Sequence, residues 1–256
     1  MKFGRFMADF HIHSTLSPCG SLEMSPKKIV EFALEKGINF IAVTDHNSYE
    51  NSIQISKFVE RNLISALYGM EVQTSEEVHL LALFDSIENL KGFGEIIYEH
   101  LPDIPNNPEY FGDQVVVDED EEIIRFEEKL LVNSITLNLD EVLSLIAHYG
   151  GISILSHVNS PHFSIVSQLG FIPENLNIDG VEVIYNTEPS RLNDREIPGI
   201  SNYPVVTFSD AHYPEEIGRG YVVFNIAKPT LEEVRKALKG LDGRSYEVYG
   251  EKGRIL

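Results

Sequence analysis

A pair of histidines near the N-terminus limits most strongly what this chain can fold into. Residues 9–13 read D-F-H-I-H and complete a strand-like run that begins at Arg5. Side chains two residues apart on a strand point to the same face, so His11 and His13 can converge on one ion. One H-x-H pair is weak evidence, because histidines also alternate along ordinary half-buried strands. The pair gains weight only if other segments repeat the pattern.

Three later segments do repeat it, each directly after an apolar, β-branched run. They contribute Asp45 and His46, then His157, then Asp210 and His212. Glu71 and His79 have similar placements. In parallel α/β folds the carboxyl ends of the strands line the active site, so these scattered residues are expected to meet on one face. For His79 taken alone, a core histidine remains the alternative.

Strand-like and helix-like patterns alternate along most of the chain. Strands are predicted at 5–11, 39–44, 63–73, 78–84, 152–155, 181–184, 205–208 and 221–224. Helices are predicted at 27–36, 50–60, 139–148, 161–169 and 230–238, the first opened by Ser25-Pro26. This order predicts parallel βα units in one domain over residues 1–256, as a barrel or a doubly wound sheet.

The alternation breaks between residues 99 and 137. Two short apolar strands, 115–117 and 123–126, flank five consecutive acidic residues at 118–122. We interpret the segment as an irregular insertion with an acidic hairpin. The hairpin could be a lid or a partner surface, or simply a solvated turn, and we favour the turn.

Composition limits the function classes. The net charge is −20, from 40 acidic and 20 basic residues, which disfavours long nucleic acid because such binding depends on Lys and Arg neutralising phosphates. A single cysteine, Cys19, permits no intrachain disulfide and fits a reducing compartment. No signal peptide or membrane span is recognisable. We therefore expect a cytoplasmic protein with no membrane partner.

The clustered residue types favour metal chemistry. Neutral imidazoles with carboxylates suit Zn²⁺, Mn²⁺ or Fe²⁺, and Glu71 could bridge two ions. Paired ions can lower the pKa of a trapped water and produce a hydroxide nucleophile. Other catalytic signatures are missing. The sequence has no G-x-S-x-G and no phosphate-binding glycine loop. A phosphatase of the Cys-x₅-Arg type is also excluded, because the residue six positions after Cys19 is Ser25 rather than arginine.

Together these motifs resemble one family. The series D-F-H-I-H-S, T-D-H-N, G-M-E, V-H-L-L-A-L, S-H-V and S-D-A-H, in this order from residue 9 to residue 212, is similar to the PHP (polymerase and histidinol phosphatase) domain family. The resemblance implies an α/β fold, a distorted TIM-like (β/α)7 barrel with the metal site at the C-terminal ends of the strands. It also implies two or three metal ions and hydrolysis of phosphate esters. The chain is too short to include a polymerase.

The resemblance also implies a ligand set. The first ion would be held by His11, His13, Glu71 and Asp210. Glu71 would bridge to a second ion, completed by His79 and His157. A third would take His46, His212 and Cys19. The family often has His or Asp at this last position, so Cys19 is a departure, and the alternative is a small buried hydrophobe.

Further residues are expected around the ions. Asp9 and Asp45 are candidates for orienting the imidazoles, although Asp45 could instead cap the following helix. Residues that could contact substrate are His162, Arg191, Arg195 and Arg219. The function expected is a metal-dependent phosphoesterase acting on a small ester such as a nucleotide, a short oligonucleotide end or a phosphorylated metabolite. The alternatives are a non-catalytic metal-binding module and a metal-dependent amide hydrolase, and the oligomeric state is left open.

Overall fold

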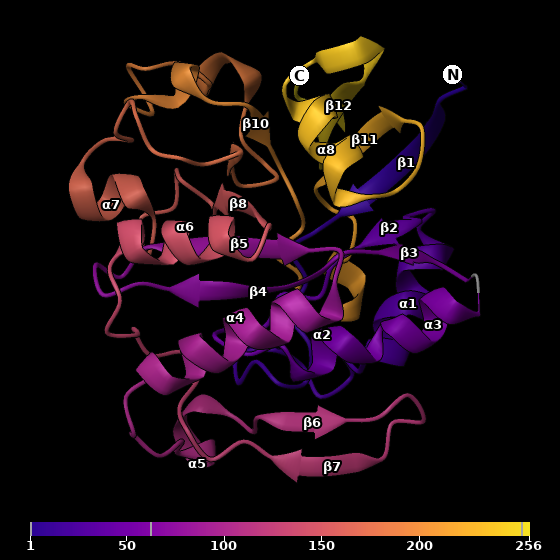
Figure 1. Ribbon diagram of the computed structural model, residues 1–256, viewed down its shortest axis with the longest axis vertical. Helices are drawn as coiled ribbons and strands as arrows, with labels where there is room; N and C mark the ends of the chain where they lie inside the picture. Colours follow the sequence, from indigo (N-terminus) through magenta and orange to yellow (C-terminus); the bar gives the residue numbers. More distant parts are fainter. Residues whose placement is uncertain (1, 62, 252) are drawn as a thin grey trace.

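The computed structural model describes residues 2–61, 63–251 and 253–256, which form a mixed α/β fold built on two sheets (Figure 1). The first sheet has the strand order β13 (Gly253–Arg254), β12 (Ser245–Gly250), β11 (Tyr221–Ile226), β1 (Gly4–Asp9), β2 (Phe40–Ile41) and β3 (Ser65–Ala66). The second has the order β10 (Val205–Val206), β9 (Gly180–Glu182), β8 (Ile152–Leu155), β5 (His79–Phe84) and β4 (Tyr68–Gln73).

Strand pairing differs from the all-parallel arrangement that the sequence predicts. β1 pairs in parallel with β2 but antiparallel with β11, and β5 is antiparallel to both neighbours, β4 and β8. Within the described residues the two sheets are joined by single bridges, Ile12 to Ala211 and His46 to Glu71, and no continuous closed barrel is formed. The expected (β/α)7 barrel is therefore not confirmed. The runs predicted at 39–44 and 205–208 keep only two strand residues each, because the backbone then leaves the sheet.

The helices cover the sheets. They are α1 (Pro26–Glu35), α2 (Glu50–Gln54), α3 (Ser56–Glu60), α4 (Ile87–His100), α5 (Pro108–Phe111), α6 (Leu139–His148), α7 (Ile165–Leu169) and α8 (Leu231–Leu238). Six of the eight helices in the described residues overlap predicted helical segments, whereas Ile87–His100 and Pro108–Phe111 were not predicted. The Ser25 hydroxyl accepts a hydrogen bond from Lys28 N and so caps α1 as predicted. The predicted helix 50–60 is interrupted at Ile55, and α7 begins four residues later than expected. Among the described residues no helix is both long and apolar enough to span a bilayer.

The 99–137 insertion carries the expected hairpin, β6 (Val115–Val117) and β7 (Ile123–Phe126), at one edge of the molecule (Figure 1). β6 is buried against the body, whereas every residue of β7 is exposed. Glu121 in the acidic turn accepts a hydrogen bond from Ser25 Oγ at 2.7 Å and pairs with Lys27 at 3.1 Å. The acidic turn is thus tied to the start of α1.

Candidate metal centre

Different strands deliver the predicted ligands to one place. His11 and His13 follow β1, His46 follows β2 by a short loop, and Glu71 lies within β4. His79 is the N-terminal residue of β5, whereas the sequence pattern led us to expect it near a carboxyl end of a strand. It still reaches the same edge because β5 runs antiparallel to β4, where His79 is the register partner of Gln73.

The candidate ligands after β8 and β10 lie on strained backbone. His157 has a φ of 29° and Asp210 a φ of 49°. L-residues rarely adopt this left-handed region, and each instance costs on the order of 1–3 kcal/mol. The surrounding fold therefore holds both side chains in place, as it does in many binding sites.

Glu71 lies at the centre of the cluster and is 1% exposed. Five imidazoles approach its carboxylate. The nitrogen–oxygen distances are 3.2 Å for His11, 3.5 Å for His13, 3.2 Å for His46, 3.2 Å for His79 and 3.3 Å for His157. Asp210 Oδ1 lies 3.4 Å from His11 Nε2 and 3.3 Å from His13 Nε2. The structure thus brings six histidines and two carboxylates together, the sixth histidine being His212, 3.7 Å from Asp210 Oδ1.

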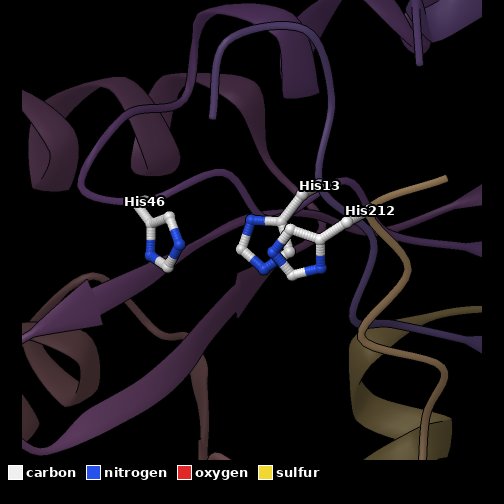
Figure 2. Close-up of side chains that lie close together, drawn as sticks. All are labelled: His13, His46 and His212. Carbon is white, nitrogen blue, oxygen red and sulfur yellow. The ribbon is translucent and has the colours of Figure 1, made fainter. Parts of the chain in front are cut away.

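Three groups within this cluster have ligand atoms all within 4.8 Å of one another: His11, His13 and Asp210; His46, Glu71 and His79; and His13, His46 and His212. Figure 2 shows the third group, in which His13 and His212 stack and His46 lies to one side. The first group contains three of the four residues expected at the first site and lacks Glu71. The others differ from the expected partition, because His46 also approaches Glu71 and His79.

Unpaired buried atoms test whether the cluster fits metal. Seven buried side-chain atoms of the described residues have no hydrogen-bond partner, and four of them belong to this cluster: His46 Nδ1, Glu71 Oε1, His79 Nδ1 and His157 Nδ1. The first three belong to one of the groups above. Buried polar atoms are normally paired, so such atoms call for a missing ligand. An imidazole nitrogen and a carboxylate oxygen are both ordinary ligands for Zn²⁺, Mn²⁺ or Fe²⁺. The residues present fit a bound divalent ion.

Outer contacts orient the imidazoles. The His13 Nδ1–H group donates to Ser17 Oγ at 2.9 Å, and that hydroxyl donates to Asp45 Oδ1 at 2.6 Å. Asp45 also accepts from Ser14, and α2 begins after Tyr49, so Asp45 orients an imidazole through Ser17 rather than capping the helix. Asp9 accepts from the backbone N–H groups of Ser209 and Gly218 and so fixes the loop that carries Asp210.

Sequence reasoning missed Glu182, which lies in β9 and is 1% exposed. Its Oε2 accepts a hydrogen bond from His11 Nδ1 at 2.9 Å and another from the backbone N–H of His157 at 3.1 Å. This leaves His11 Nε2 free to face Glu71. The one available signal was a charged residue inside the apolar run V-E-V-I.

The cluster's charges shift several pKa values. Burial alone would lower the pKa of His11, but the carboxylates of Glu182, Glu71 and Asp210 outweigh it and raise that pKa well above its usual value. Burial would likewise raise the pKa of Glu71, yet the neighbouring imidazoles hold it well below its usual range. Burial and the approach of His13 lower the pKa of His46 well below normal. The cluster thus favours an ionised Glu71 and a neutral His46.

The candidate substrate-binding residues separate into two groups. Arg219 and His162 line the same cavity as the ligands. Arg219 is held by the carbonyl oxygens of Ser209 and Asp210 and by Glu216. Arg191 and Arg195 are exposed and do not line this cavity, so the structure does not bring them to the site.

Cys19 lines the cavity, but its sulfur belongs to none of the ligand groups found among the described residues. Burial of its sulfur, with the nearby charges of Glu71 and Asp210, raises the thiol pKa to about 12. The residue as a whole is exposed rather than a buried hydrophobe. Its role as a ligand stays a prediction.

The cavity above the cluster has a volume of about 500 Å³, within the range of sites that bury small molecules. Besides the ligands its walls include Phe111, Val132, Phe163, Ile184, Tyr185 and Phe208. Phe111 and Val132 come from the 99–137 insertion, whereas no residue of the acidic turn 118–122 lines it. The insertion therefore contributes a wall, not an acidic lid.

The fold and the cluster together define an α/β protein with a histidine- and carboxylate-rich metal centre. The chain belongs to the PHP domain family, whose model matches residues 9–163, and a PHP-associated model matches residues 200–241. The resemblance read from the motifs is thereby confirmed. An uncharacterised protein of Methanocaldococcus jannaschii is 27% identical over 186 residues, which cover 69% of this chain and 80% of that protein.

Solved structures share the fold at low identity. The lesion-specific endonuclease Q of Pyrococcus furiosus aligns with a TM-score of 0.66 and 20% identity over 95% of this chain and 58% of its own. A two-domain protein of Bacteroides vulgatus, containing a predicted PHP-like metal-dependent phosphoesterase, aligns with a TM-score of 0.55 and 15% identity over 98% of this chain and 66% of its own. The chain thus spans little more than half the length of the endonuclease.

One expectation is wrong. Endonuclease Q was solved in complex with a 27-mer duplex substrate with an abasic lesion at the active site, and it aligns with a TM-score of 0.64 and 21% identity over 94% of this chain and 58% of its own. The exclusion of long nucleic acid from the −20 net charge therefore does not hold, and a nucleic acid partner is possible. Net charge sums the whole surface, whereas nucleic acid meets only one face of a protein and any cations bound there.

Proposed function

We propose that this protein is a metal-dependent phosphoesterase. The observation that carries the proposal is the single buried carboxylate of Glu71, which five imidazoles approach within 3.5 Å at the floor of an open cavity. The proposed ligands are His11, His13, His46, Glu71, His79, His157, Asp210 and His212, with Cys19 as a further candidate. Two or three divalent ions bound there would polarise the phosphate oxygens and activate the attacking water.

The chain's own residues prepare the site. Glu182 and the Ser17–Asp45 pair fix the rings of His11 and His13, so that their Nε2 atoms face the carboxylates of Glu71 and Asp210. Arg219 holds the Asp210 loop through two backbone carbonyl oxygens. His162 lines the cavity wall, and we expect it to contact the ester or its leaving group. This preorganisation favours catalysis over metal storage, because the oriented cluster lines a cavity that a substrate can enter.

The ester could be a small phosphate monoester or a phosphodiester within a nucleic acid. The endonuclease of the same fold supports including the second. The decisive experiment measures phosphate release or strand cleavage by purified protein loaded with Mn²⁺, Zn²⁺ or Fe²⁺, on aryl phosphates, nucleotides and a duplex with an abasic site. We expect turnover that EDTA abolishes and metal restores. Inactivity of fully metallated protein on every ester would instead favour the non-catalytic metal-binding module.

A further inference from the structure

The cavity holds more than a phosphate needs. Its floor carries the metal-ligand cluster, but much of its wall is aromatic or aliphatic. Such a wall offers water few hydrogen bonds, whereas an apolar part of a ligand would be stabilised by contact with it. Two of the aromatic residues, Phe163 and Phe111, remain exposed although they line the cavity.

Phe163 is held in a costly conformation. Its φ of 54° lies in the left-handed region, and its carbonyl oxygen accepts a hydrogen bond from His79 N at 2.9 Å. Its ring stacks on the His79 ring with a centroid distance of 4.9 Å and an interplanar angle of 10°. The side chain is still 41% exposed. Because His79 covers one face of the ring, the other face is the one left for a ligand.

Phe111 reaches the cavity from the 99–137 insertion, as the last residue of α5, and is 38% exposed. The next residue, Gly112, has a φ of 101°, and a Cβ there would lie 2.3 Å from the carbonyl oxygen of Pro18. Only glycine allows this close approach to the loop that follows His13. The insertion therefore packs against the loop that follows His13, with Phe111 on the cavity side.

We propose that Phe163 and Phe111 form a stacking subsite for a planar aromatic group attached to the phosphate ester, such as a nucleobase. Aromatic rings offer flat faces that stack on any base regardless of its hydrogen-bonding edge. The inference rests on the proposed function only for the position of the phosphate over the metal cluster. The subsite then accounts for the apolar wall and for the contribution of the insertion.

The test compares two ligands that share a ribose 5-phosphate group. Calorimetry gives the affinities of the metal-loaded protein for adenosine 5′-monophosphate and for ribose 5-phosphate. We expect the nucleotide to bind about tenfold more tightly, as one stacked base would contribute. Phe163→Leu and Phe111→Leu should each reduce this ratio, whereas Phe163→Tyr should retain it. Phe126→Leu, on exposed β7 outside the cavity, is the matched control and should leave the ratio unchanged.

The outcomes separate the subsite from the proposed function. Equal affinities for the two ligands in the wild type, including no measurable binding of either, overturn the subsite, as do Leu variants that keep the full preference. Turnover of phosphate esters without a preference for aromatic ones would leave the proposed function standing and refute the subsite. Preferential binding of the nucleotide without turnover of any ester would support the subsite and refute the proposed function. Thermal denaturation of each variant shows that it is folded.

Discussion

Glu182→Gln is the sharpest probe of the metal centre. The substitution keeps the shape of a side chain that is 1% exposed but removes its charge. In the wild type, Oε2 accepts hydrogen bonds both from His11 Nδ1 at 2.9 Å and from His157 N at 3.1 Å. The amide oxygen of glutamine can still accept from these donors, but its NH₂ group cannot. Because Oε1 of Glu182 also lies 3.2 Å from His11 Nδ1, either orientation of the amide sets its NH₂ group against a donor.

The magnitude follows from what such contacts contribute elsewhere. Loss of a carboxylate that orients a ligating histidine typically costs 10- to 100-fold in metal affinity, about 1.4–2.7 kcal/mol. A second effect has the opposite sign. The carboxylate raises the pKa of His11, so its loss eases deprotonation and favours metal binding at low pH. The deficit in metal affinity should therefore be larger at pH 8 than at pH 6.

A competition titration against a chromophoric zinc chelator measures this deficit. Glu196→Gln is the matched control, because Glu196 is exposed and pairs only loosely with Arg191 at 3.5 Å. It should bind Zn²⁺ like the wild type. A folded Glu182→Gln protein with wild-type affinity at both pH values would show that His11 is not a ligand oriented by this carboxylate.

The remaining predictions concern how the ions are shared. Glu71→Ala should lose more bound metal and more activity than His46→Ala, because the Glu71 carboxylate meets five imidazoles; the reverse order by elemental analysis would contradict its bridging position. Cys19→Ser should lose one ion selectively and keep the others, and a wild-type metal content would show that the sulfur is not a ligand.

Several of the candidate ligands could be chosen from the sequence because they follow a local pattern. His11, His46 and Asp210 all come within three residues of the end of an apolar run, and in the structure the chain has left the sheet by these positions. The path of the strands was less predictable. Antiparallel β5 and the short β2 and β10 depend on pairing between distant segments, which periodicity does not encode.

Helix α4 was not predicted from the sequence, because local helix propensity gives little support for it. The run L-K-G-F-G-E contains two glycines, which disfavour a helix by roughly 1 kcal/mol each relative to alanine. In the fold, a Cβ on Gly94 would lie 2.2 Å from the ring of Tyr49, so glycine is required for close packing against the residue that precedes α2. Tertiary contact outweighs propensity here, and no window of the sequence contains both partners.

Four buried carboxylates, among them Glu182, which sequence reasoning missed, indicate how the site balances its charge. Asp9, Asp45, Glu71 and Glu182 are each 1% exposed or less. Burying an ionised carboxylate costs several kcal/mol unless a cation or several donors compensate it. Asp9 and Asp45 accept hydrogen bonds from N–H and O–H groups, which offset burial only in part, since burial still raises the pKa of both carboxyls, that of Asp9 to about 6. Within the described residues, the carboxylate of Glu71 is approached by five imidazoles. Arg219 is the sole Lys or Arg among the described residues that line the cavity, and its guanidinium is turned toward backbone carbonyl oxygens. Divalent cations held by Glu71 and its imidazoles would add positive charge that no Lys or Arg of the described cavity lining supplies to this carboxylate.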